Sequence, residues 1–273
     1  MHILTRTLLV CLLAPGLAAA QSSDASLKAA AGLIKRVLPA AAADFEVAFI
    51  PKSNGRDVFE LESRNGKIVL RGNNAVSIGS ALNYYLKNYA HCDIGWNGSN
   101  LHLPSPLPPV AQKVRKETPY RYRYYLNYCT FNYSMSWWNW DRWQWEIDWM
   151  ALNGINMPLA LTGQNTIWKK VYNSLGFTDK DLESFFSGPA YFNWFWMGNL
   201  DGWGGPLPQS WLVQHEALQK KILERERSLG MTPILPALAR CLRPASRICS
   251  ESTLRPHRMD RHGSSKTAQS NIC

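Results

Sequence analysis

The chain has 273 residues and a formal net charge of +10, with 46% hydrophobic and 12% aromatic residues. This length allows one large domain or two smaller ones. Half of the net charge lies at one end, because residues 240–273 hold seven Lys or Arg and two Asp or Glu, which gives +5. No basic stripe with interleaved aromatic residues runs through the rest of the chain, so we expect no nucleic-acid partner.

The N-terminus has the pattern of a secretory signal peptide, predicted to be residues 1–20. Arg6 supplies a positive charge, residues 8–13 form a short apolar core, and three alanines end the segment as a cleavage site. The apolar run is too short for a transmembrane helix, which needs ~20 apolar residues. We therefore predict a secreted or periplasmic protein that is cleaved after Ala20 and has no membrane partner after cleavage.

Residues 24–110 are predicted to form a small N-terminal α/β domain. The expected elements are a helix over residues 25–37, a strand over 45–50, a hairpin of 58–62 with 67–71, and a helix that is capped by Asn73 or Asn74 and runs to Tyr89. The Asn65-Gly66 dipeptide is typical of a tight hairpin turn. A proline-rich stretch at residues 103–109 predicts a boundary between this domain and the next.

Residues 118–239 alternate between predicted strands and helices. The expected elements are strands over residues 123–128, 155–161 and 232–238, helices over 137–153 (capped by Ser134 or Ser136), 164–175 and 210–229, and a helix that starts at a capping box of Thr178 and Asp181. Apolar strands separated by helices imply a parallel sheet. The α/β fold class predicted here is therefore the first strands and helices of an incomplete (β/α)8 barrel, since a whole barrel needs ~250 residues. A doubly wound sheet is the alternative, disfavoured because no glycine-rich loop follows the first strand.

Eleven of the twelve tryptophans fall between Trp137 and Trp211. Aromatic rings stack on the apolar faces of sugars, but they are also ordinary core material. Trp194, Trp196 and Trp203 lie in a predicted loop rich in Gly and Trp, where exposed aromatic residues need a reason. These three are the better candidates for a carbohydrate site.

Several long strings resemble the α-N-acetylglucosaminidases of glycoside hydrolase family 89. They are YYLNYCT at residues 124–130, WWNWDRW at 137–143, EIDWMALNGIN at 146–156, FFSGPA at 185–190, MGNL at 197–200, GPLP at 205–208 and GMTPILPA at 230–237. The resemblance covers residues 118–239, and residues 24–110 resemble the small domain that precedes the barrel in that family.

The resemblance implies hydrolysis of terminal α-linked N-acetylglucosamine from glycans, with retention of configuration. The family uses two glutamates, one as acid/base and one as nucleophile, which flank the scissile bond. In the family both lie on later barrel strands, beyond the matched residues. No catalytic residue is therefore assigned, and this chain is expected to be inactive. The mechanism requires no metal or cofactor, and no metal-ligand spacing is present. The alternative is a non-catalytic, truncated paralogue that binds glycan.

The candidate substrate-binding residues are Asn127, Cys129, Tyr133, Gln164, Trp194 and Asn199. Active sites of (β/α)8 barrels lie at the carboxyl ends of the strands, where Asn127 and Gln164 could hydrogen-bond sugar hydroxyls or the acetamido group. By the resemblance, Asn127, Cys129 and Tyr133 match positions that contact the sugar ring, and Trp194 matches an aromatic wall. The alternatives are a small buried thiol for Cys129 and packing against the tryptophan-rich helix for Tyr133.

Two carboxylates and two cysteines carry further expectations. Glu146 and Asp148 lie inside a predicted helix, away from any strand end, so we expect them to pair with Arg142 or to cap backbone rather than to catalyse. A disulfide between Cys92 and Cys129 is compatible with the sequence but is not indicated by it.

Residues 240–273 lose hydrophobic periodicity and become rich in Arg, Ser and His. The family pattern continues at this point with Gly-His-Val-Pro, which is absent here. We predict a frameshift, in the gene or in its sequence record, near the codon for Arg240. A genuine basic tail is the alternative.

Overall fold

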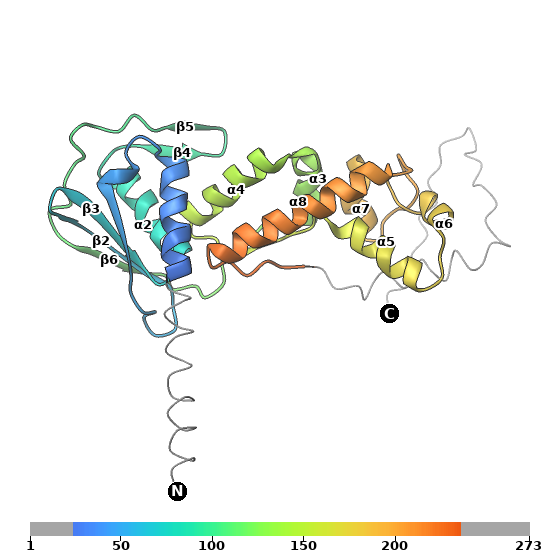
Figure 1. Cartoon of the computed structure of the whole chain (residues 1–273), viewed down its shortest axis with the longest axis horizontal. Helices are drawn as coiled ribbons and strands as arrows, with labels where there is room; N and C mark the ends of the chain where they lie inside the picture. Colours follow the sequence, from blue (N-terminus) through green and yellow to red (C-terminus); the bar gives the residue numbers. More distant parts are fainter. Residues whose placement is uncertain (1–23, 236–273) are drawn as a thin grey trace, which may run out of the picture. The chain divides into compact units, whose positions relative to one another are not determined.

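A computed structural model describes residues 24–235. The predicted signal peptide, the predicted basic tail and the end of the third barrel strand, residues 236–238, lie outside these residues. The described residues belong to one compact unit. In it, a module with a mixed sheet is followed by helices around a short parallel sheet (Figure 1). The predicted α/β fold is confirmed, and the barrel is not closed within the described part.

The N-terminal module is built on a four-stranded sheet with the order β1-β3-β2-β6. Its elements are a helix over residues 24–37, a 3-10 turn Ala42–Asp44, β1 Phe45–Phe49, β2 Val58–Arg64, β3 Lys67–Gly72, α2 Ala75–Asn88, β4 Asp93–Gly95, β5 Gly98–Asn100 and β6 Val114–Glu117. β1 is parallel to β3, whereas β2 is antiparallel to both β3 and β6. Helix α2 crosses the helix of residues 24–37 at Gly79, where a Cβ would lie 3.0 Å from Leu33.

The predicted elements of this module are confirmed, and their local causes are visible. Asn65 and Gly66 have φ values of 52° and 77°, the left-handed conformation that a two-residue hairpin turn needs. Asn74 caps α2 by accepting a hydrogen bond from the amide of Ser77. Asn73 instead accepts from the amide of Val58 and donates to Asp57, which ties the start of β2 to the start of α2.

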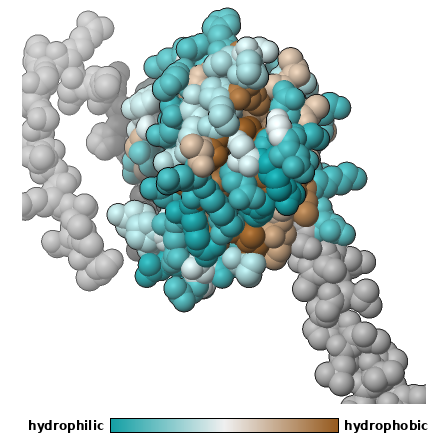
Figure 2. Space-filling model, turned by 90° about the vertical axis from the view of Figure 1, so that its left-hand side faces the viewer, coloured by the Kyte–Doolittle hydropathy of each residue, from teal (hydrophilic) through white to brown (hydrophobic). Residues whose placement is uncertain are grey.

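The hairpin β4–β5 and the strand β6 were not predicted. β6 follows the proline-rich stretch and returns to the module's sheet, where Val58 pairs with Glu117. Three of its four residues, Arg115, Lys116 and Glu117, are charged and exposed. Charged side chains protect an edge strand from pairing with another chain. The face of the molecule on the side of the N-terminal module is largely hydrophilic (Figure 2).

The second part has a short parallel sheet with helices packed around it. Its elements are β7 Tyr124–Tyr125, α3 Tyr128–Ser134, a 3-10 turn Met135–Trp137, α4 Trp140–Leu152, β8 Met157–Pro158, α5 Gln164–Ser174, α6 Asp179–Glu183, a 3-10 turn Pro189–Tyr191, α7 Phe192–Trp196 and α8 Gln209–Ser228. β7 is parallel to β8, and Leu159 forms a parallel bridge with Ile234. Three consecutive strands therefore lie side by side in chain order, as in a (β/α)8 barrel.

Three predicted boundaries in this part are wrong. The strand predicted over residues 155–161 is limited to Met157–Pro158 and is followed by an isolated bridge at Leu159. The strand predicted over residues 123–128 ends at Tyr125, because Asn127 caps α3 and the helix starts at Tyr128. The helix predicted from residue 137 starts at Trp140, where Asn139 rather than a serine accepts a hydrogen bond from the amide of Arg142. The capping box of Thr178 and the helix over residues 209–228 are confirmed.

The predicted loop of residues 187–208 contains helix α7. Trp194 and Trp196 lie in this helix, and Trp196 is buried, with its indole N–H 2.5 Å from the side-chain oxygen of Asn165. The expectation of three loop tryptophans therefore holds for Trp203 alone, which is 60% exposed. The helix was missed because the segment is rich in Gly and Trp, but most of the apolar residues of α7 are buried and stabilise it.

The cysteines and helices of the described part settle two smaller points. Cys92 is buried and Cys129 is exposed, and both are free thiols, so the compatible disulfide is not formed. Among residues 24–235, no helix combines the length and the apolarity that crossing a membrane requires.

Candidate functional site

The first predicted sugar contacts, Asn127 and Cys129, follow the end of β7, the first parallel strand. Between β7 and α3, Leu126 has a φ of 81°, which is an outlier for a residue with a side chain. Such strained residues persist only where their surroundings hold them, and they gather at functional sites. The next residue, Asn127, is exposed and accepts a hydrogen bond from the amide of Thr130 at 3.0 Å. The strained turn and this cap together fix where α3 begins.

Cys129 and Tyr133 lie four residues apart on α3 and therefore share one face of it. Cys129 is exposed, and Tyr133 is 74% exposed. The two alternatives from the sequence, a buried thiol and a packed tyrosine, are therefore wrong. This face of α3 is accessible to a ligand.

Trp194 and Asn199 are brought beside α3 by the packing of α7. The rings of Phe131 and Trp196 lie 5.6 Å apart, and the side-chain amide of Asn132 donates to the carbonyl of Ala190 at 3.0 Å. Trp194 is half-buried, and its carbonyl accepts from the amide of Asn199, an exposed residue. Five of the six predicted contacts thus lie on, or within three residues of, the two helices α3 and α7, which pack together.

Gln164 is the predicted contact that is least accessible. It is the first residue of α5, six residues after the end of β8, and it is only 8% exposed. The neighbouring Asn165 accepts the hydrogen bond from Trp196, so α5 also packs against α7. Gln164 therefore lies at the predicted strand end with its side chain in the core.

Glu146 and Asp148 lie on α4, and each pairs with an arginine, which is the predicted Arg142 for Glu146 alone. Glu146 is fully buried and lies 3.0 Å from Arg142. Asp148 forms two hydrogen bonds with Arg36, at 2.6 and 2.7 Å. Burial raises the pKa of Asp148, although the Arg36 guanidinium opposes the rise. The link to Arg36 in the N-terminal module was not predicted, because the two residues are 112 positions apart.

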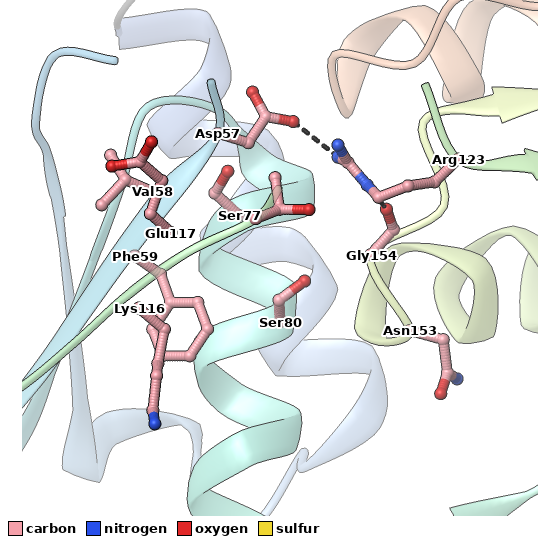
Figure 3. A pocket seen from close by; sticks show the side chains of 11 residues that line it. Asp57, Val58, Phe59, Ser77, Ser80, Lys116, Glu117, Arg123, Asn153 and Gly154 are labelled. Atoms are coloured by element: carbon pink, nitrogen blue, oxygen red, sulfur yellow. Dashed lines mark hydrogen bonds and ion pairs between the residues drawn. The ribbon is translucent and has the colours of Figure 1, made fainter. Parts of the chain in front are cut away.

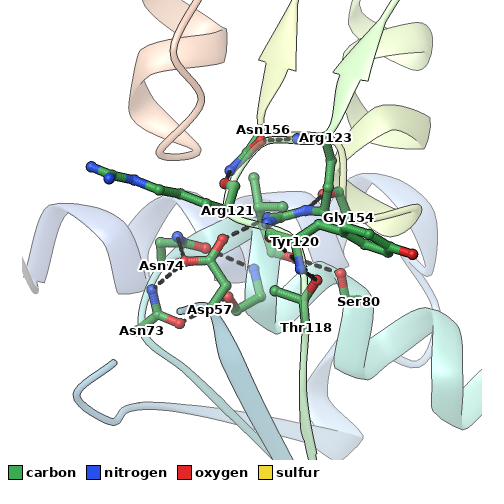
Figure 4. Close-up of polar contacts among 12 residues, drawn as sticks. Asp57, Asn73, Asn74, Ser80, Thr118, Tyr120, Arg121, Arg123, Gly154 and Asn156 are labelled. Atoms are coloured by element: carbon green, nitrogen blue, oxygen red, sulfur yellow. Dashed lines mark hydrogen bonds and ion pairs between the residues drawn. The ribbon is translucent and has the colours of Figure 1, made fainter. Parts of the chain in front are cut away.

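A second charged contact between the two parts is centred on Asp57 and Arg123 (Figure 4). Their side chains approach to 2.5 Å, and Arg123 also donates to the carbonyl of Gly154. Burial alone would raise the pKa of Asp57, but hydrogen bonds from Arg123 and Asn73 outweigh it and hold the pKa below its ordinary value. No local pattern in the sequence signals this pair.

Two cavities lie where the module meets the second part. One of about 240 Å³ is lined by residues that include Asp57, Ser77, Lys116 and Arg123 (Figure 3). The other, of about 220 Å³, is lined by Arg36 and by Trp145 on α4. Neither is lined by a predicted sugar contact. Within residues 24–235, no group of three or more His, Cys, Asp or Glu could hold a metal ion.

The loop that carries Trp203 depends on a close contact between two glycines. The amide of Gly188 donates to the carbonyl of Trp203 at 2.7 Å, and a Cβ on Gly188 would lie 2.0 Å from the carbonyl oxygen of Gly204. Gly188→Ala is therefore expected to displace this loop and to lower the free energy of unfolding by about 1–3 kcal/mol. Urea unfolding and hydrogen exchange in residues 185–205 measure both effects. Gly98→Ala is the control, because its Cβ would meet nothing within 4 Å. Equal behaviour of the two variants would contradict the prediction.

The chain matches two family models in sequence order. Residues 28–109 match the N-terminal domain of alpha-N-acetylglucosaminidase, and residues 123–246 match its TIM-barrel domain. The chain is 45% identical over 235 residues to alpha-N-acetylglucosaminidase of Homo sapiens, which covers 84% of this chain and 32% of the human protein. The matched part thus spans about a third of that relative.

A solved structure agrees with these matches. The family 89 glycoside hydrolase from Clostridium perfringens, in complex with 2-acetamido-1,2-dideoxynojirmycin, is similar with a TM-score of 0.77 and 39% identity, over 80% of this chain and 25% of that chain. A variant of the same enzyme with two glutamates replaced by glutamine is in complex with its substrate GlcNAc-alpha-1,4-galactose, with the same TM-score, identity and coverage. The two domain matches, the identity and the shared fold agree, and the chain belongs to the alpha-N-acetylglucosaminidase family, glycoside hydrolase family 89.

Proposed function

We propose that this chain provides the first part of a site for terminal α-linked N-acetylglucosamine, in a family that releases this sugar by retaining hydrolysis. The observation that carries the proposal is that α3, which bears Cys129 and Tyr133 and closely follows β7, packs against α7, which bears Trp194 and ends three residues before Asn199. The Clostridium perfringens relative binds GlcNAc-alpha-1,4-galactose as its substrate, which supports the same class of ligand here.

The chemistry of the proposed site divides between binding and cleavage. Tyr133 and Trp194 offer aromatic faces for the apolar side of a sugar ring, and Asn127 and Asn199 offer carboxamides for its hydroxyl and acetamido groups. Retaining hydrolysis also needs two carboxyl groups ~5–5.5 Å apart around the scissile bond. Glu146 and Asp148 do not suit this role, because both are buried and paired with arginines. We therefore assign sugar binding, without hydrolysis, to residues 24–235.

The proposed place of action is outside the cytoplasm, in the periplasm or the extracellular medium. The support is the signal-peptide pattern of residues 1–20, which lie outside the described part. Glycans with terminal N-acetylglucosamine are the proposed partners.

Binding of N-acetylglucosamine to the chain tests the proposal directly. Saturation-transfer NMR is expected to detect the sugar, and Tyr133→Ala is expected to weaken its affinity about fivefold, since one stacked aromatic ring contributes on the order of 1 kcal/mol. Tyr120→Ala is the matched control, because Tyr120 is similarly exposed, at 68% against 74% for Tyr133, but is not a predicted contact. A chain that binds no sugar, or two variants that lose affinity equally, would refute the proposed site.

An assay for cleavage separates binding from hydrolysis. The chain is expected to bind 4-nitrophenyl α-N-acetylglucosaminide without releasing 4-nitrophenol. Release by the purified chain, abolished by Tyr133→Ala but not by Tyr120→Ala, would show that this polypeptide is itself the enzyme.

A further inference from the structure

The carboxylate of Glu146 joins the N-terminal module to the first barrel strand. It is fully buried and accepts hydrogen bonds from the hydroxyl of Tyr125 at 2.8 Å and from the indole N–H of Trp96 at 2.9 Å. Tyr125 is the last residue of β7, whereas Trp96 lies in the turn between β4 and β5. Two segments that belong to different domains therefore meet on one side chain of α4.

The charge of Glu146 is compensated in place. Arg142, one helical turn earlier, lies 3.0 Å from the carboxylate oxygen that accepts the 2.9 Å hydrogen bond from Trp96. The guanidinium carbon of Arg142 is 4.0 Å from the ring centre of Trp138 and 4.4 Å from that of Trp145, distances at which a cation is attracted to a ring face. A buried carboxylate with this many partners is costly to rearrange. The Glu146 carboxylate is therefore a fixed point in the structure: its hydrogen-bond partners keep it in one position.

Tyr125 connects this fixed point to the predicted sugar site. Burial raises the pKa of Tyr125, and the charge of Glu146 raises it further, so its hydroxyl remains a proton donor to the carboxylate. The residue after Tyr125 is Leu126, with its strained φ of 81°, and the next is Asn127, the cap of α3. The hydrogen bond from the hydroxyl of Tyr125 to Glu146 thus fixes the last residue of β7, directly before the turn that sets the direction of α3.

We propose that Glu146 is a positioning residue: through Tyr125 it holds the turn at Leu126, and through Trp96 it makes that turn depend on the N-terminal module. The claim that the turn is held stands on its own, whereas its relevance to sugar binding rests on the function proposed above. In this way the N-terminal module stabilises the turn at Leu126 next to the proposed sugar site without itself contacting the ligand.

Hydrogen exchange followed by mass spectrometry tests whether the turn is held. Tyr125→Phe removes the hydroxyl and keeps the ring, and Trp96→Phe removes the indole donor, which lies 29 positions earlier in the chain. Both are expected to speed exchange in residues 126–131 by about two- to tenfold, the range set by the loss of one hydrogen bond. Exchange in α2 is expected to stay unchanged, and circular dichroism confirms that each variant is folded.

Asp148→Asn is the matched control. Asp148 is also a buried carboxylate of α4 paired with the N-terminal module, but its ion-pair partners are Arg36 and Arg225 and not a residue of β7. It is expected to leave residues 126–131 unchanged. The proposal is overturned if Trp96→Phe loosens only its own hairpin, or if Asp148→Asn loosens the turn as much as Tyr125→Phe does.

N-acetylglucosamine binding to the same variants separates this proposal from the proposed function. If the parent chain binds the sugar, Tyr125→Phe and Trp96→Phe are expected to weaken binding by the factor seen in exchange, and Asp148→Asn is expected to bind normally. Faster exchange in a chain that binds no sugar would refute the proposed function but leave the held turn established. Unchanged exchange in a chain that binds sugar would refute the role of Glu146 alone.

Discussion

At pH 7, Glu226→Gln is expected to raise the free energy of unfolding by roughly 3 kcal/mol. Glu226 lies on α8, is 1% exposed and has one carboxylate oxygen without a hydrogen-bond partner among the described residues. Burial raises its pKa to about 8, against a slight opposing effect of Arg227. Glutamine has the shape of the protonated acid and cannot ionise, so it removes the cost of keeping this group in the core.

The pH dependence gives the sign of this effect. Below pH 4.5, the ordinary pKa of the group, both folded and unfolded chains hold the proton. Between pH 4.5 and about 8 the unfolded chain releases it and the folded chain keeps it, so stability falls by up to about 1.4 kcal/mol per pH unit. Urea unfolding at several pH values should show this slope in the parent chain and a flatter profile in Glu226→Gln. The exposed Glu224, two residues earlier on α8, supplies the control Glu224→Gln. Parallel pH profiles of parent and Glu226→Gln would disprove the prediction.

Asp57→Ala is expected to be the most destabilising single change at the contact between module and barrel strand. It removes the partner of Arg123, whose side chain is only 18% exposed, and also an acceptor of the Asn73 side chain. Breaking one side of a largely buried ion pair costs about 3–5 kcal/mol, because the remaining charge keeps its desolvation without compensation. The unfolding midpoint in urea measures the loss.

Glu117→Ala controls for a charge change beside the same cavity. Glu117 faces Arg56 at 4.0 Å, and both side chains are substantially exposed, so the change should cost at most about 1 kcal/mol. Because the pKa of Asp57 is lowered in the folded chain, its contribution is present above the ordinary value of 3.8 and is lost as the pH falls through the folded pKa. Asp57→Ala should therefore also lessen the loss of stability in acid. Similar midpoints for the two variants would show that the Asp57 pair contributes little.

The sequence predicts those parts of the structure whose causes are local. The turn at Asn65-Gly66, the cap at Asn74 and the capping box of Thr178 each depend on a few neighbouring residues, and each is confirmed. The early end of the first barrel strand was missed, because a leucine gives no sign that it adopts a φ of 81°. That conformation is imposed by packing and not by the residue itself.

The candidate site divides in the same way. The predicted strand end places Cys129 and Tyr133 near the candidate site, whereas the helix α3, on which they share an exposed face, was not predicted. The bonds of Glu146 to Trp96 and of Asp148 to Arg36 join residues 50 and 112 positions apart. No periodicity relates such residues, so only the folded chain shows which arginine or tryptophan each carboxylate meets.

The return of β6 to the module's sheet has a consequence for how the chain assembles. Only six positions separate Glu117, the last residue of β6, from Arg123, which binds Asp57 directly before β2. A connection this short spans at most about 20 Å and keeps the two ends at a high effective concentration. Once residues 114–117 pair with β2, the short connection keeps β7 close to the folded module, so that the two need not meet by a long-range search of the chain. The pairing of β6 with β2 thus restricts β7, the first barrel strand, to positions next to the N-terminal module.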